Sequence, residues 1–322
     1  MLHVIIDADP VVYRAGFAAE THNYQVIAET PDGELVEKFF PKCEESSAGA
    51  KKIAWKKEHE DYIILEDTMI PDVEPLPFAL RGVKLTMEAC IQDAEREMRQ
   101  KATTVSVLLS GPDNFRNEIA TIKPYKGNRD KAYRPIHYEA IRKYMFDNWD
   151  ARLIEGHEAD DECSILSWVD FAADTPYVIC TIDKDLDQIP GPHYDYAKKV
   201  MYDVDINDAS YFFWKQTLTG DPTDNIQGMF RVGDKAADKM LGAWLENYNT
   251  GDVVASTEET WEEYRWRLTV AAYAQNMKKY PEKYPEGMTA AEAALENARL
   301  VFMQTYPGQL WTPPGQPDEE TT

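Results

Sequence analysis

Eight acidic residues gather in four short clusters of this chain, where predicted strands and helices begin or end. Asp7 ends an apolar run at the N-terminus, and Asp183 follows the apolar run YVICTI. Two like charges about 4 Å apart repel by roughly 1 kcal/mol in water and about 4 kcal/mol at an effective dielectric near 20. Mg²⁺ and Mn²⁺ prefer carboxylate and water ligands, so one shared cluster would be a divalent-cation site. The eight are Asp7, Glu158, Asp160, Asp161, Asp183, Asp185, Asp221 and Asp224.

Each cluster also has an ordinary structural interpretation. The EADD motif begins a predicted helix, where acidic residues are common caps. The DKD motif that follows YVICTI is compatible with a polar turn, and GDPTDN with an Asx-type loop. The order of the motifs, and their places at element ends, favour one site over separate turns.

Strands and helices alternate along the first two thirds of the chain. This alternation predicts an α/β fold, a parallel sheet with helices on both faces. Its ligand site should lie beyond the carboxyl ends of the strands, where Asp7 and Asp183 are expected. The predicted strands are 2–6, 105–110, 151–154 and 177–182, and the predicted helices are 11–19, 84–100, 137–147 and 161–171.

The remaining segments do not fit this alternation. Residues 24–40 predict a hairpin around PDG, and we interpret 24–77 as an insertion of unassigned function. After about Ser210, amphipathic stretches at 209–218, 234–248, 260–279 and 290–305 predict a mostly helical region. The expected division is an α/β domain over 1–208, a helical region over 209–312 and a disordered acidic tail over 313–322.

The composition is typical of a globular protein of about two domains. Of its 322 residues, 43% are hydrophobic, and no stretch reaches the roughly 18 apolar residues that a spanning helix needs. The acid directly after the first apolar run argues against a signal peptide. The four cysteines have no CxxC spacing, which favours reduced thiols in a cytoplasmic protein. They are Cys43, Cys90, Cys163 and Cys180.

The net charge of −23 argues against a polyanionic ligand until the distribution of charge is considered. Between Lys123 and Arg134, five basic residues accompany one acid, Asp130. Tyr125 and Tyr133 lie in the same segment, a composition suited to neutralising phosphates and stacking on bases. A solvated basic loop is the alternative. The basic residues are Lys123, Lys126, Arg129, Lys131 and Arg134.

The run EADD, DKD, GDPTDN and GMFRVGDKAADKML resembles the 5′-nuclease (flap-endonuclease-like) superfamily. The resemblance covers about Leu2–Ala19 and Val105–Leu241. Within the superfamily, VIIDADPVVYRAG and NFRNEIATIKPYKGNRDKAYRP look most like the 5′→3′ exonucleases of short-tailed lytic bacteriophages. The resemblance implies a PIN-like nuclease domain with an arch or gateway at 113–135, followed by a helical DNA-binding region with a helix-hairpin-helix-type motif.

The resemblance also implies two divalent metals, Mg²⁺ or Mn²⁺. Asp7, Glu158 and Asp160 match the positions around the first. Those around the second are matched by Asp161, Asp183, Asp185, Asp221 and Asp224.

One position departs from the family. The family usually has an Asp just after the second strand, where this chain has Ser110 or Gly111, and Asp113 comes two or three positions later. Either Asp113 substitutes for it, or the first metal has lost a ligand. The six histidines form no HExxH or paired motif, and we interpret His157 as structural.

The same resemblance assigns nucleic-acid contacts. Tyr125 would stack on a terminal base, and Lys126 and Arg129 would steer the scissile phosphate and stabilise its developing charge. The segment GMFRVGDKAADKM would form the hairpin, with K⁺ as a possible bound ion, and would grip the DNA backbone without reading sequence. The further contacts expected are Lys131, Arg134, Gly228, Arg231, Gly233, Lys235 and Lys239.

The leading hypothesis is a two-metal 5′→3′ exonuclease acting on 5′ ends of duplex DNA and on RNA in RNA–DNA hybrids. The phage-like resemblance implies roles in DNA replication, recombination and host DNA degradation, in the host cytoplasm and beside replication proteins. One alternative is a structure-selective 5′ flap endonuclease acting on flapped DNA. Another is a nuclease-dead DNA-junction binding protein, motivated by the missing Asp.

Overall fold

The computed structural model describes residues 1–42, 47–129, 133–250 and 259–315. The chain divides into two compact units, which are described one at a time. The first comprises Met1–Pro10, Ala89–Tyr133 and Asp150–Thr322, and the second comprises Val11–Glu88 and Arg134–Trp149. The predicted acidic tail lies outside the described residues from position 316 on.

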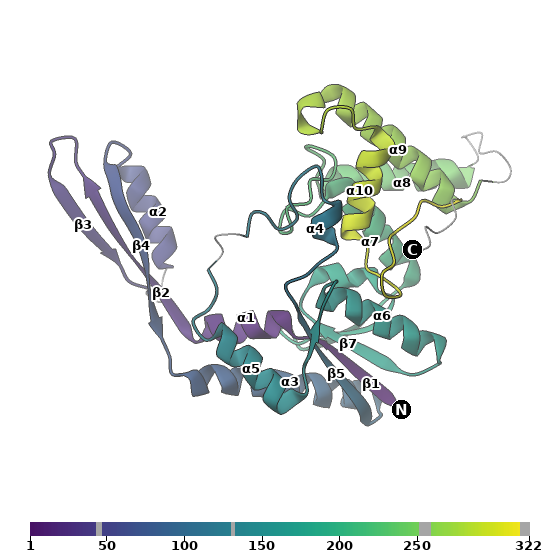
Figure 1. Ribbon diagram of the computed structural model, residues 1–322, viewed down its shortest axis with the longest axis horizontal. Helices are drawn as coiled ribbons and strands as arrows, with labels where there is room; N and C mark the ends of the chain where they lie inside the picture. The colour runs from purple at the N-terminus through teal and green to yellow at the C-terminus, as the bar shows by residue number, and fades with distance from the viewer. Residues whose placement is uncertain (43–46, 130–132, 251–258, 316–322) are drawn as a thin grey trace. The chain divides into compact units, whose positions relative to one another are not determined.

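A six-stranded sheet forms the centre of the first unit, in the order β6-β5-β1-β7-β8-β9. Figure 1 labels β1, β5 and β7 of this sheet. Every pairing is parallel except that of β8 with β9. The fully buried β1 is paired on both sides, and Asp7 at its end lies opposite Leu108 of β5. The predicted α/β fold class is confirmed. The strands are β1 Leu2–Asp7, β5 Ala102–Ser110, β6 Arg152–Ile154, β7 Tyr177–Thr181, β8 Gly191–Asp195 and β9 Val200–Val204.

Helices pack against both faces of this sheet, because alternate residues of its buried strands point to opposite sides. On one face, α6 (Ala159–Ala172) places Cys163 in a cluster with Ile5 and Ile179. On the other, Cys180 approaches the carbonyl of Cys90, in the C-terminal part of α3 (Leu76–Met98), with its Sγ at 3.9 Å. Burial raises the pKa of the Cys163 and Cys180 thiols, as expected of structural cysteines.

The second half of the first unit is helical and has its own core, which includes Trp214, Leu241 and Tyr273. Capping boxes at Thr260 and Thr289 begin two of its helices. The four predicted amphipathic helices are confirmed, although the last ends at Val301 instead of Thr305. These helices are α7 Ile206–Thr219, α8 Asp234–Thr250, α9 Trp261–Lys279 and α10 Ala290–Val301, and the short helices of the unit are α4 Arg116–Ile119, η1 Lys184–Gln188 and η2 Pro281–Lys283.

The second unit contains an antiparallel sheet in the order β3-β2-β4, whose β2–β3 pair confirms the predicted hairpin. Its α2 covers one face, where Val26, Phe40 and Trp55 pack together. Strand β4 was not predicted, because its sequence has no clean alternation of apolar and polar residues. The elements are β2 Glu20–Glu29, β3 Leu35–Phe40, α2 Ala48–Glu58, β4 Ile63–Val73 and α5 Tyr138–Trp149, with most of α1 Asp9–Ala18 and the start of α3.

Among the described residues, no helix is both long enough and apolar enough to span a bilayer.

Candidate metal and nucleic-acid site

Three carboxylates meet at the carboxyl edge of the central sheet. Asp7, only 3% exposed at the end of β1, accepts a hydrogen bond from Thr181 Oγ1 of β7 at 3.0 Å. Asp183 follows β7 and caps η1 by accepting from the Asp185 amide at 3.0 Å. Asp160 lies in the first turn of α6. Neighbouring parallel strands end at the same edge, so residues far apart in sequence come together there.

Asp7 and Asp160 are buried beside other carboxylates, and nearby positive charge does not offset the repulsion between them. Burial, then the charges of Asp9 and Asp183, raise the pKa of Asp7 well above its usual range. Burial, then Glu158 and Asp7, do the same to the pKa of Asp160. A buried cluster of like charges becomes stable in its ionised form when a cation is added.

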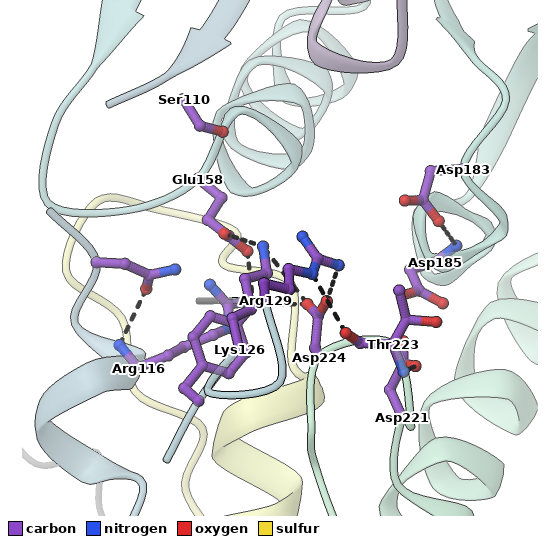
Figure 2. Close-up of polar contacts among 12 residues, drawn as sticks. Ser110, Arg116, Lys126, Arg129, Glu158, Asp183, Asp185, Asp221, Thr223 and Asp224 are labelled. Atoms are coloured by element: carbon purple, nitrogen blue, oxygen red, sulfur yellow. Dashed lines mark hydrogen bonds and ion pairs between the residues drawn. The ribbon is translucent and has the colours of Figure 1, made fainter. Parts of the chain in front are cut away.

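Asp185 and Asp221 form a second pair, joined by a hydrogen bond between their side chains. Burial, then the charge of Asp183, raise the pKa of Asp185 to about 8. Burial opposes ionisation of Asp221, but the bond from Asp185 lowers its pKa. Gln216 Nε2 also donates to Asp185 Oδ1 at 2.7 Å. Without a cation, the two carboxylates share one proton, and Figure 2 shows them beside Asp183.

This pair predicts a pH-dependent stability of the metal-free protein. The folded-state pKa of Asp185, about 8, exceeds its usual value of 3.8, so folding takes up a proton. Its stabilising contribution is complete below the unfolded pKa and is lost as the pH rises through about 8. We therefore expect the thermal midpoint in EDTA to fall between about pH 5 and about pH 9. Asp185→Asn should show a smaller fall, and an equal fall in the variant would contradict the assignment.

Two side chains of the basic segment form ion pairs with the two remaining candidate ligands, Glu158 and Asp224 (Figure 2). Lys126 Nζ pairs with Glu158 and lies 3.5 Å from Asp224 Oδ2, while Arg129 pairs with Asp224. The Tyr125 hydroxyl lies 2.7 Å from Glu158 Oε2 and 2.8 Å from Asp224 Oδ2. Two of the carboxylates that were expected to surround metals, Glu158 and Asp224, thus form ion pairs with basic side chains of the same chain.

Backbone contacts hold this segment in place. The Lys126 amide donates to the Asp224 carbonyl at 2.8 Å, and Asn225 Nδ2 donates to the Pro124 carbonyl at 2.8 Å. Lys126 adopts a φ of 52°, a region that L-residues rarely occupy. Tyr125 is only 8% exposed, so its ring is not presented for the predicted base stacking in this conformation.

Asp161 does not join the carboxylate cluster. It is fully buried, and both its oxygens accept from Arg116, at 2.6 and 3.0 Å. Burial opposes the charged form of Arg116, but the charge and hydrogen bonds of Asp161, together with Tyr125 and Glu158, raise its pKa well above the usual range. In this structure Arg116 engages both oxygens of Asp161, whereas the resemblance placed this carboxylate around the second metal. No local pattern identifies Arg116, 45 residues earlier, as the partner of Asp161.

The carboxylate that lies at the end of β5 belongs to Asp9, whereas the sequence suggested Asp113. Asp113 is exposed on the loop that follows β5. The Ser110 amide instead donates to Asp9 Oδ2 at 2.9 Å, and Ser110 Oγ accepts from the Ala159 amide at 2.9 Å. Asp9 was missed, although its spacing of two residues from Asp7 in IIDADP was a usable signal.

We expect Asp9→Ala to weaken Mn²⁺ binding more than Asp113→Ala does. Asp9 contributes negative charge beside Asp7, whereas Asp113 is exposed on its loop. Loss of a residue that supports a metal ligand typically costs about 10–100-fold in affinity. Titration of Mn²⁺ followed by electron paramagnetic resonance measures both variants against the unsubstituted protein. A larger loss for Asp113→Ala would restore the original assignment.

The predicted hairpin lies between α7 and α8. Gly228 is buried: its amide donates to Asn297 Oδ1 at 2.8 Å, and a Cβ there would meet the Thr219 carbonyl carbon at 2.2 Å. It is therefore required for packing, which differs from the expected phosphate contact. The remaining predicted hairpin residues are exposed: Arg231, Gly233, Lys235 and Lys239.

The last two predicted contacts lie elsewhere. Lys131 lies outside the described residues, and Arg134 belongs to the second unit, where its guanidinium lies 5.1 Å from the centre of the Tyr138 ring.

A groove connects the carboxylates with the start of α8 and contains residues that the sequence did not indicate. Its lining includes Asp221, Thr223 and Gly233, together with Lys184 and Lys215. Lys215 Nζ pairs with Asp238 of α8 at 2.9 Å. The two lysines place positive charge beside an otherwise acidic site.

The donor set suits hard divalent cations, since it consists of carboxylates without cysteine or histidine. Within the described part of the chain, no three such side chains already form a coordination shell. The ion pairs of Glu158 and Asp224 and the bond between Asp185 and Asp221 account for this, because each engages a carboxylate with another protein group.

No protein-family model and no curated protein matches the chain. Among solved structures, the bacteriophage T5 D15 protein co-crystallized with metal ions is similar at 18% identity and a TM-score of 0.50, over 95% of this chain and 91% of that one. The T5 5′-exonuclease with zinc ions bound gives 20% identity and a TM-score of 0.44, over 68% and 80% of the two chains. A T5 D15 flap endonuclease complex with DNA and metal ions gives 19% and 0.44, over 72% and 82%. The first of these likenesses shows a common fold.

Proposed function

We propose that this chain, which shares the fold of the phage T5 5′-nucleases, is a metal-dependent 5′-nuclease that acts on DNA. More specifically, we propose a two-metal 5′→3′ exonuclease that acts on duplex 5′ ends. The observation that carries the proposal is the pairing of Glu158 and Asp224 with Lys126 and Arg129, beside the uncompensated Asp7 and Asp160.

The family resemblance, and not their positions alone, suggests how the carboxylates divide between two cations. We assign one cation to Asp7, Glu158 and Asp160, with Asp9 nearby, and a second to Asp183, Asp185, Asp221 and Asp224. When bound, two such ions supply a water of lowered pKa and neutralise the departing 3′-oxygen. Asp183 influences the pKa of Asp7, Asp160 and Asp185, so it is suited to face both groups.

The basic segment supplies the groups that bind the substrate. Lys126 and Arg129 are held at the carboxylates, where a scissile phosphate would arrive. If Lys126 and Arg129 exchanged their carboxylate partners for the phosphate, both positive charges would lie beside the negative charge that develops on it. Arg231, Lys235 and Lys239 at the start of α8 are exposed and would grip the backbone farther along the duplex. Such contacts select structure and not base sequence.

The test is incubation of a 5′-labelled blunt DNA duplex with Mg²⁺ or with EDTA. Release of labelled mononucleotide only with Mg²⁺ supports the exonuclease, and excision of a longer fragment from a 5′ flap identifies the endonuclease alternative. An RNA–DNA hybrid tested in parallel examines primer removal, the activity that would give the protein a role in phage replication. Inactivity on every substrate with Mg²⁺ and with Mn²⁺ would reject the proposal.

A DNA-junction binding protein without nuclease activity is the second candidate. It is motivated by the position at the end of β5, where the chain has Ser110 or Gly111 in place of the Asp that the resemblance leads one to expect. The retained acidic cluster argues against this candidate, because a protein that only binds DNA would gain affinity by losing charges that repel phosphate. Gel shifts of junction DNA that are equal in Mg²⁺ and EDTA, without cleavage, would support this candidate.

A further inference from the structure

The buried Arg116 connects three segments of the first unit. It is 2% exposed and begins α4, shortly after β5. Its Nε donates to the Leu300 carbonyl and its NH2 to the Phe302 carbonyl, both at 2.8 Å. The same guanidinium forms the two bonds to Asp161. These bonds join the start of α4 to the first turn of α6, to Leu300 near the end of α10 and to Phe302 just after it.

Asp161 is the acceptor that joins Arg116 to α6. Besides Arg116, it accepts from the Glu158 amide and from the Gln304 amide, each at 3.2 Å. Asp161 is the third residue of α6, Glu158 is its N-cap, and Asp160 lies between them. The bonds to Asp161 therefore determine where the first turn of α6 begins, and with it the directions of the Glu158 and Asp160 side chains.

The end of α10 and the residues that follow it are themselves part of the site. Leu300, Val301 and Met303 line one cavity with Glu158, Asp160, Asp185 and Asp221. Gln188 Nε2 also donates to the Val301 carbonyl at 2.6 Å. Phe302–Thr305 was expected to continue α10, but the contacts with Arg116 and Asp161 use its backbone groups in place of helical bonds.

We infer that Arg116 is a positioning residue: through Asp161 it fixes Glu158 and Asp160 for cation binding and makes this binding depend on segment 300–304. The inference rests on the proposed function. A planar guanidinium that forms two parallel bonds sets orientation as well as charge, which a lysine does not reproduce. Groups that orient metal ligands typically contribute about 10–100-fold to metal affinity.

The experiment compares Mn²⁺ binding, measured by electron paramagnetic resonance on the full-length chain, with thermal stability. Arg116→Met should weaken Mn²⁺ binding by about 10–100-fold. The matched control is Arg265→Met, which removes another buried arginine, 4% exposed, from α9. The control should lower the thermal midpoint and leave Mn²⁺ binding at the wild-type level.

Two further variants separate positioning from folding. The double variant Arg116→Met with Asp161→Leu removes both charges, so it should fold even if the single variant does not. Arg116→Lys keeps a charge beside Asp161 and loses the paired bonds. We expect both to bind Mn²⁺ at least about 10-fold more weakly than wild type, at recovered or moderately lowered stability. Wild-type Mn²⁺ affinity in either variant would overturn the inference, whereas a wild-type protein that binds no Mn²⁺ would instead reject the proposed function.

Discussion

Replacing Asp183 with alanine should abolish metal-dependent cleavage while leaving the binding of duplex DNA largely intact. Asp183 lies two residues after the end of β7, and its charge adds to burial in raising the pKa of Asp7, Asp160 and Asp185. It therefore contributes to both proposed cation positions. The loss should exceed about 100-fold, the upper range for residues that only support a metal ligand. Single-turnover cleavage and gel shifts in Ca²⁺ measure the two properties separately.

Asp187→Ala is the matched control. Asp187 lies in the same short helix η1, but it accepts from the Tyr202 hydroxyl at 2.9 Å and does not belong to the proposed ligand sets. Its loss should leave cleavage nearly unchanged. Cleavage that survives in Asp183→Ala but fails in Asp187→Ala would show that the ligands are wrongly assigned.

Lys126→Met should change metal binding and cleavage in opposite directions. In the metal-free structure Lys126 neutralises Glu158, so a divalent cation must compete with its ammonium group. Removing that group should strengthen Ca²⁺ binding, measured by calorimetry. The same change removes a charge proposed to stabilise the phosphate in the transition state, and cleavage should slow by about 10²–10³-fold.

Lys123→Met controls for the loss of one positive charge, because Lys123 is exposed in the same segment. It should alter neither property substantially. If Lys126→Met weakens both Ca²⁺ binding and cleavage, the ammonium group supports the metal site, and the proposed competition is refuted.

The sequence predicted the elements whose residue patterns are strong. Buried parallel strands such as β1 and β7 appear as unbroken apolar runs, and the caps Thr260 and Thr289 begin two of the predicted helices. Strand β4 was missed because it belongs to a small sheet with most of its side chains exposed. Its apolar residues, beginning with the run Ile63–Leu65, do not alternate with polar ones, so the period-2 pattern on which such predictions depend is missing.

The site was predicted less completely, because long-range partners leave no local signal. Nothing around Asp161 distinguishes it from Asp160, yet one pairs with Arg116 and the other joins the carboxylates. The end of α10 was misplaced for the same reason, since Gln304 bonds to Asp161 across 143 residues. A tertiary contact overrides local helix propensity when it provides hydrogen-bond partners for the same backbone groups.

The cavity wall formed by Leu300, Val301 and Met303 has a consequence during synthesis of the chain. The proposed ligand Asp7 is synthesised nearly three hundred residues before this wall and before the Leu300 and Phe302 carbonyls that accept hydrogen bonds from Arg116. A nascent chain that carries most of the acidic residues therefore still has an incomplete site. We therefore expect the proposed nuclease activity to be absent from chains whose synthesis has not yet reached Met303.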